Sequence, residues 1–150
     1  MTDRPTSHVP VTEWAPLVPE LTVSDLARSL SVYTELFGFT VLYTRPGFAY
    51  LSHGRAQLML EQERAGNAWQ TGPLERPYGR GINLQLDVPD VLAVLARLEQ
   101  AGYPVQVPLQ TASYFEGETE HRQREFLALD PDGYLWRFQD GGGPAPESEP

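Results

Sequence analysis

Residues 18–43 read VPELTVSDLARSLSVYTELFGFTVLY, and residues 82–107 follow the same plan as INLQLDVPDVLAVLARLEQAGYPVQV. Each stretch holds an alternating run, a junction with Asp, an amphipathic segment, a Gly followed by an aromatic residue, and a second run of β-forming residues. In register, Asp25 corresponds to Asp90 and Gly38 to Gly102. A repeat of this length predicts two similar halves that pair to bury their apolar faces.

Composition limits the classes of function. The chain has 150 residues, 41% of them hydrophobic and 21% charged, which is typical of one globular domain. Its net charge of -9 disfavours nucleic acid and membrane surfaces as partners and favours a cationic ligand, although surplus acid also serves solubility. The absence of cysteine excludes disulfides and thiolate chemistry. No apolar run is long enough to span a membrane and residues 1–16 do not resemble a secretory signal, so we expect a cytoplasmic protein.

The first half predicts a strand, a helix and three more strands. Residues 17–23 alternate as a strand, and Ser24 is the expected cap of a helix with Asp25 in its first turn. The helix has one apolar stripe, made of Leu26, Leu30, Tyr33 and Phe37. Gly38 is expected to end it. The further strands are predicted at residues 39–44, 48–52 and 57–62.

The second half predicts the same elements. Strands are expected at residues 82–87, 103–107, 124–129 and 134–139. Val91, Val94, Leu95 and Leu98 form the stripe of a helix over residues 90–100. Residues 111–123 are predicted to be a polar loop, and residues 130–133, DPDG, a tight turn. The domain organisation is therefore an arm (1–15), a first module (16–62), a linker (63–80), a second module (81–140) and a disordered tail (141–150).

The doubled β-α-β-β-β pattern, with VSDL and VPDV before the helices and REFLALDPDGYLWRF at the end, resembles the vicinal-oxygen-chelate superfamily. That superfamily includes glyoxalase I, extradiol dioxygenases, fosfomycin-resistance enzymes and bleomycin-resistance proteins. The resemblance covers residues 16–140. It implies an α+β fold of two βαβββ modules that form a shared curved-sheet cleft with helices outside. Many members are dimers, so a homodimer is expected.

The resemblance also indicates where a metal would be bound. Enzymes of the superfamily hold a divalent ion with His or Gln, and Glu, from the first and last strands of both modules. The matching positions here are Val18, Met59, Asn83 and Arg137. These side chains do not make such a site, so we expect no metal, no cofactor and no catalytic residues. A slip of two residues in the first hairpin would place Glu61 in the cleft, and His8, His53 and His121 are interpreted as surface residues.

Without a metal, the resemblance narrows to the bleomycin-resistance branch, whose members bind a drug without chemistry. The function expected is sequestration of a cationic or aromatic drug, with a bleomycin-like compound as one candidate, as a form of antibiotic resistance. Aromatic wall residues are predicted to be Phe48, Tyr50, Trp69, Tyr78, Tyr114 and Phe115, and polar contacts Glu20, Glu61, Asn83, Gln85 and Arg137. For Phe48, Tyr50 and Tyr114 core packing is an equal alternative. Arg122 stands where well-known bleomycin binders carry a stacking Trp, which is a departure from that branch.

Two alternatives remain open from the sequence. One is a metal-dependent glyoxalase-like or dioxygenase-like enzyme whose ligands lie at other positions. The other is a protein whose cleft has decayed, so that it no longer binds a ligand, and whose role is assembly alone. Tight binding of a divalent ion would favour the first, and a ligand that raises the melting temperature would exclude the second.

Overall fold

The structure is a computed structural model that describes residues 7–8 and 13–141. Most of the predicted arm, with the side chain of His8, and all but the first residue of the predicted tail lie outside the described residues. The chain falls into two compact units that divide between Tyr78 and Gly79. Across the described residues, no helix is long and apolar enough to cross a membrane.

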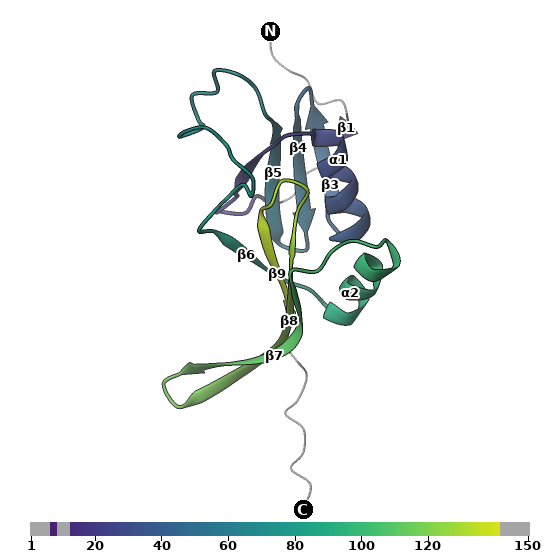
Figure 1. The fold of residues 1–150 in the computed structure, drawn as a ribbon, viewed down its shortest axis with the longest axis vertical. Helices are drawn as coiled ribbons and strands as arrows, with labels where there is room; N and C mark the ends of the chain where they lie inside the picture. The colour runs from purple at the N-terminus through teal and green to yellow at the C-terminus, as the bar shows by residue number, and fades with distance from the viewer. Residues whose placement is uncertain (1–6, 9–12, 142–150) are drawn as a thin grey trace, which may run out of the picture. The chain divides into compact units, whose positions relative to one another are not determined.

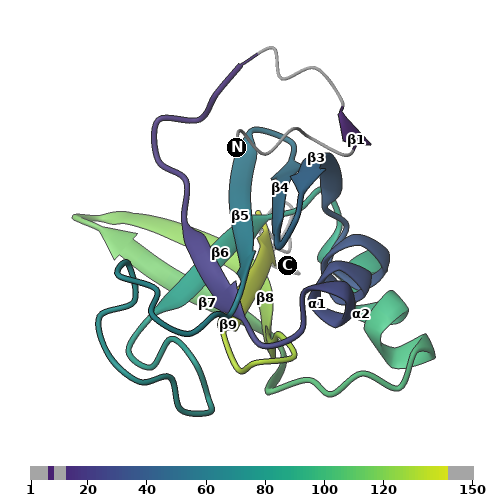
Figure 2. The same cartoon turned by 90° about the horizontal axis from the view of Figure 1, so that it is seen from above.

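The first unit is one mixed sheet with one helical segment (Figure 1). Its elements are β1 (Ser7–His8), β2 (Glu20–Val23), α1 (Leu26–Ser31), the π-helical turn η1 (Val32–Leu36), β3 (Thr40–Arg45), β4 (Phe48–His53) and β5 (Ala56–Gln62). The strand order is β1-β3-β4-β5-β2. Strands β3, β4 and β5 run antiparallel and side by side (Figure 2), while β2 returns parallel to β5.

The core of the first unit follows the predicted alternation. Leu21 and Val23 of β2 are buried, whereas Glu20 and Thr22, which alternate with them, are half-buried on the opposite face. Tyr33 and Phe37 of the helical stripe are fully buried, and their rings meet edge to face at 5.3 Å. The strand prediction for residues 17–19 was wrong: β2 begins at Glu20, and the side chain of Leu17 is 82% exposed.

The start of α1 differs from the sequence prediction. Asp25, not Ser24, is the N-cap, and its carboxylate accepts a hydrogen bond from the backbone N–H of Arg28 at 3.2 Å. A second acceptor comes from the last strand: Gln62 Oε1 accepts from the N–H of Leu26 at 2.8 Å. The predicted stop is confirmed, because Gly38 has the positive φ of 85° that glycine tolerates best.

The second unit repeats the topology of the first. Its elements are β6 (Asn83–Asp87), α2 (Val91–Gln100), β7 (Val107–Glu116), β8 (Thr119–Leu129) and β9 (Leu135–Asp140). The order β6-β9-β8-β7 again places the first strand parallel to the last. Together the two sheets confirm the predicted α+β class and the two βαβββ modules.

Burial in the second unit also follows the sequence pattern. Val91, Val94 and Leu98 of α2 are buried, as are Trp136 and Phe138 of β9. The N-cap of α2 is Asp90. The buried carboxylate of Asp140, at the end of β9, accepts a hydrogen bond from the first N–H of α2 at 3.0 Å. The DPDG turn is confirmed. Oδ1 of the buried Asp130 accepts hydrogen bonds from three backbone N–H groups of the turn, each at 2.9 Å.

Residues 103–123 of the second unit differ from the sequence prediction. Residues 103–106 are not a strand, because β7 begins at Val107. Residues 111–123 are not a loop either: they form the outer part of the long β7–β8 hairpin (Figure 1), with Ser113 paired to Arg122 and Tyr114 to His121. Polar side chains are compatible with this structure because the ribbon exposes nearly all of them.

Candidate functional site

A cavity of about 500 Å³ lies in the first unit. Its lining residues are Glu20, Arg45, Pro46, Gly47, Phe48, Glu61, Gln62, Arg64 and Trp69. Thus four of the predicted ligand-binding residues, two acidic and two aromatic, come together in one place. The volume is within the usual range for small-molecule sites.

The pairing of β2 with β5 brings the two carboxyl groups of the cavity together. Glu20 pairs with Met59 and Thr22 with Glu61, so the two Glu are diagonal neighbours on the face that does not carry the buried leucines. Their side chains are in hydrogen-bonding contact. Burial, and then the hydrogen bond and the charge of Glu61, raise the pKa of Glu20 to about 7. The same hydrogen bond lowers the pKa of Glu61. One proton is therefore shared by the pair near neutral pH.

Two arginines balance the charge of the pair. The guanidinium carbon of Arg45 lies 3.9 Å from the ring centroid of Phe48, which is cation–π geometry. Arg64 Nε lies 3.2 Å from Glu61 Oε1. Trp69, at 83% exposure, contributes a largely open indole to the lining. The cavity thus offers an available aromatic ring beside a polar floor on which cations and carboxyl groups are nearly balanced.

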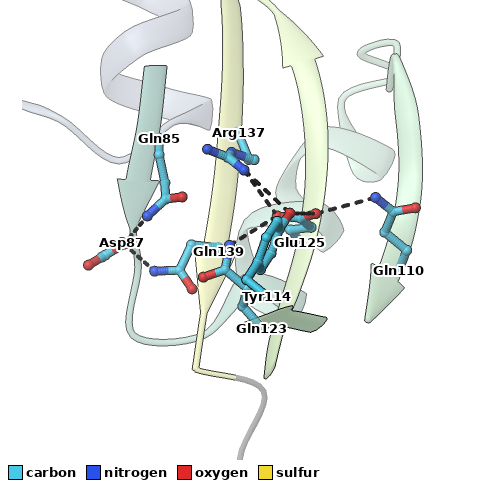
Figure 3. A network of polar contacts seen from close by, with 8 residues as sticks. All are labelled: Gln85, Asp87, Gln110, Tyr114, Gln123, Glu125, Arg137 and Gln139. Carbon is cyan, nitrogen blue, oxygen red and sulfur yellow. Dashed lines mark hydrogen bonds and ion pairs between the residues drawn. The ribbon is translucent and has the colours of Figure 1, made fainter. Parts of the chain in front are cut away.

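The second unit carries a polar network around one buried carboxylate (Figure 3). Glu125 is 2% exposed, and its Oε1 accepts from the hydroxyl of Tyr114 at 2.8 Å and from Gln110 Nε2 at 3.3 Å. Its Oε2 accepts from Gln123 Nε2 at 3.2 Å. Arg137 Nη1 is 3.8 Å from the same oxygen. The network is largely self-satisfied, which is the usual state of a buried charge.

Arg137 is loosely held in this network. Its Nη1 reaches the Tyr114 hydroxyl at 3.4 Å, a long hydrogen bond. Its Nε is buried and has no hydrogen-bond partner among the described residues. Gln85 lies on the neighbouring strand, where it donates to Asp87 at 3.3 Å, and Gln139 donates to the same carboxylate.

Other predicted site residues lie outside both clusters. Tyr50 is buried, stacks on Tyr43 at 5.2 Å, and burial raises the pKa of its hydroxyl. Tyr78 is buried, and its hydroxyl donates to Glu63 at 3.2 Å. Asn83 is exposed at the start of β6. Phe115 is 69% exposed near the tip of the β7–β8 hairpin.

Sequence reasoning missed the residues that complete each cluster. Arg45 and Arg64 flank predicted strands and belong to no motif. The signal that could have found them is their position at strand ends, close in sequence to Phe48 and Glu61. Glu125 had a clearer signal, because in the predicted strand 124–129 it alternates with the buried Phe126.

A model of the family described as "Glyoxalase/Bleomycin resistance protein/Dioxygenase superfamily" matches residues 15–138. The chain belongs to this superfamily. A search of curated proteins gave no match. Similar solved structures include a virulence protein from Salmonella typhimurium (21% identity, 87% of this chain and 98% of that chain, TM-score 0.62). Another is TioX from Micromonospora (23% identity, 85% of this chain and 99% of that chain, TM-score 0.62). A third is lactoylglutathione lyase from Agrobacterium tumefaciens (20% identity, 88% of this chain and 96% of that chain, TM-score 0.59). At these identities the likeness shows the fold alone.

The metal that enzymes of this superfamily hold does not fit the matching positions. The parallel pairs place Met59 beside Glu20 and Arg137 beside Gln85, so a thioether and a guanidinium occupy corresponding places in the two units. Val18 has no ligand atom in its side chain, and the guanidinium opposes a second cation. Among the described residues, no group of three or more His, Asp or Glu is close enough together to hold a metal ion.

Proposed function

We propose that this superfamily member is a small-molecule binding protein of the bleomycin-resistance type, which sequesters an aromatic or cationic compound without converting it. The cavity of the first unit supports the proposal most directly. It combines an open indole, that of Trp69, with the carboxyl pair of Glu20 and Glu61. The side chains at the superfamily's metal positions agree with binding rather than catalysis, since they supply no ligand set for an ion.

The proposal places the compound against Trp69. Aromatic stacking gives a planar ligand contact area at little entropic cost, and the polar groups of the cavity fix its orientation. Because Phe48 is already covered by Arg45 and is itself buried, Trp69 is the ring best placed to stack on a ligand.

A thermal-shift screen tests this function. Bleomycin-type glycopeptides, other planar drugs and divalent metals are compared side by side. A ligand of the native state raises the free energy of unfolding by RT ln(1 + [L]/Kd), and the melting temperature rises with it. We expect at least one planar compound to raise it in the absence of metal. A stabilising effect of a divalent metal alone, or conversion of the bound compound, would instead indicate the enzyme alternative.

Two tryptophan variants locate the ligand. Trp69→Ala is expected to abolish the ligand-induced shift, since it removes the stacking surface. Trp14→Ala is the matched control, because Trp14 is also exposed but does not line the cavity. An equal loss in both variants would place the compound elsewhere. Expression of the wild type and Trp69→Ala in cells exposed to the drug then measures resistance, and light scattering tests the proposed homodimer.

A further inference from the structure

In the first-unit cavity, two arginine side chains of the protein already contact the surfaces that a planar cationic ligand would use. One guanidinium, of Arg45, lies over an aromatic face, and another, of Arg64, lies on a carboxylate. An aromatic face and a carboxylate are the two surfaces that planar nitrogen cations prefer. The chemistry of the cavity floor is therefore complementary to that class of group.

We propose that this cavity binds an amidinium or guanidinium group carried on an aromatic ring, with Glu20 and Glu61 accepting its N–H groups and Trp69 stacking on the ring. The proposal rests on the proposed function for the place of the ligand, and it adds the chemical class. A planar cation with parallel N–H groups matches two carboxylates better than a compact ammonium does, because each N–H edge faces one acceptor.

The shared proton couples binding to pH. The charged groups that face Glu20 are Glu61 of β5, Arg45 at the end of β3, and Arg64 after β5. With its pKa near 7, Glu20 is mostly protonated at pH 6 and mostly ionised at pH 8. A cation that enters at pH 6 displaces this proton, which passes to the buffer while the ligand keeps its own. Affinity is therefore expected to rise from pH 6 to pH 8.

Arg64 is an internal competitor for the same carboxylate. Its side chain is 62% exposed and reaches Glu61 from three residues along the chain, which makes this ion pair easy to displace. Replacing it with glutamine removes the competing cation while keeping a polar side chain. Arg64→Gln is expected to bind the ligand about two- to fivefold more tightly, the range that corresponds to release of one exposed ion pair.

Benzamidine is the probe, and isothermal titration calorimetry of the full chain is the assay. Titrations at pH 6 and pH 8, each in two buffers of different ionisation enthalpy, count the protons released. We expect release of close to one proton at pH 6 and close to none at pH 8. Benzamide and benzoate, neutral and anionic probes of the same shape, are expected to bind at least about tenfold more weakly, since they lack the charge-assisted hydrogen bonds.

Glutamine variants assign the effect to the pair. Glu20→Gln should abolish the proton release and weaken benzamidine binding about tenfold or more. Glu118→Gln, in the exposed turn of the β7–β8 hairpin, removes the same charge as Glu20→Gln at pH 8 and should leave both unchanged. Circular dichroism confirms that each variant is folded.

The outcomes separate this inference from the proposed function. If another compound binds against Trp69 while benzamidine does not, the cationic class is wrong and the binding function stands. If benzamidine binds no better than benzamide, or binds at pH 6 without proton release, the carboxyl pair is not its site. If no compound of the screen binds, both proposals fail.

Discussion

Replacing Glu20 with glutamine is expected to change how the stability of the protein depends on pH. Burial raises the pKa of Glu20 from 4.5 to about 7 in the folded protein, with the neighbouring Glu61 adding to the effect. Between pH 5 and 7 the folded state therefore keeps a proton that the unfolded chain releases. The free energy of unfolding of the wild type falls as the pH rises through this window and levels off near pH 8.

The size of the effect follows from the two pKa values. The difference between 4.5 and about 7, at about 1.4 kcal/mol for each pH unit, sets a ceiling of about 3 kcal/mol. Glu20 is only half-buried, so solvent screening lowers the expected loss to about 1–2 kcal/mol. Glutamine mimics the neutral acid, keeps an N–H donor for Glu61, and has no charge to lose. Glu20→Gln should therefore match the wild type at pH 5 and exceed it by about 1–2 kcal/mol at pH 8.

Urea unfolding followed by circular dichroism at pH 5, 6, 7 and 8 measures this difference, with equal m-values required for the comparison. Glu118→Gln serves as the control for the loss of one negative charge at an exposed site. A constant difference between Glu20→Gln and the wild type at all four pH values would refute the reasoning, because it would mean that Glu20 titrates alike in the folded and unfolded states.

Three further substitutions test the packing of the second unit, each by urea unfolding at pH 7. Trp136→Ala should destabilise the protein by about 3–5 kcal/mol, because the indole is buried in the core of the second unit. Asp140→Ala should cost about 3 kcal/mol, since it breaks a partly buried ion pair with Arg124 at 2.6 Å and removes an acceptor from the first N–H of α2. Gly79→Ala should cost more than 1 kcal/mol, because its φ is +71° and a Cβ would lie 2.4 Å from the ring of Tyr134. A loss below 0.5 kcal/mol in any of them would contradict the corresponding contact.

The repeated elements could be predicted from the sequence because their signals are local. The stripe of α2, the hairpin of β4 and β5, and the DPDG turn depend on residues within a few positions of each other, and the structure confirms them. The first stripe is confirmed only at Tyr33 and Phe37, because the helix continues as the π-helical turn η1 and Ser29, not Leu26 or Leu30, is buried in α1. The β7–β8 hairpin was missed for a related reason. Its exposed strands have no buried face, so residues 111–116 show no alternation of apolar and polar side chains.

The helix starts show a second limit. Ser24 is a good N-cap by residue type, but its hydroxyl accepts from Arg76 Nη2 at 3.1 Å, and Asp25 has the extended φ of −145° that a cap requires. The additional acceptor comes from a residue 36 positions away, Gln62, and local sequence contains no sign of such a contact. The candidate site also depends on a long-range contact, since Glu20 and Glu61 meet only through the parallel pairing of β2 with β5.

The same repeat explains why one fold presents two different kinds of polar site. Gln62 and Asp140 end the last strand of each unit, and each accepts from the first N–H of its helix, so this architectural contact is retained with different residue types. The neighbouring polar faces differ. The first unit has the carboxyl pair of Glu20 and Glu61 in an open cavity, whereas the second surrounds its single carboxylate, Glu125, with donors. Glu125 is buried and held by several donors of its own chain, so a ligand would have to replace all of them. The pair in the first unit is held by a shared proton and by the exposed ion pair with Arg64, and a cationic ligand can displace both. Of the two polar faces, the one in the first unit is therefore the place to look for the ligand.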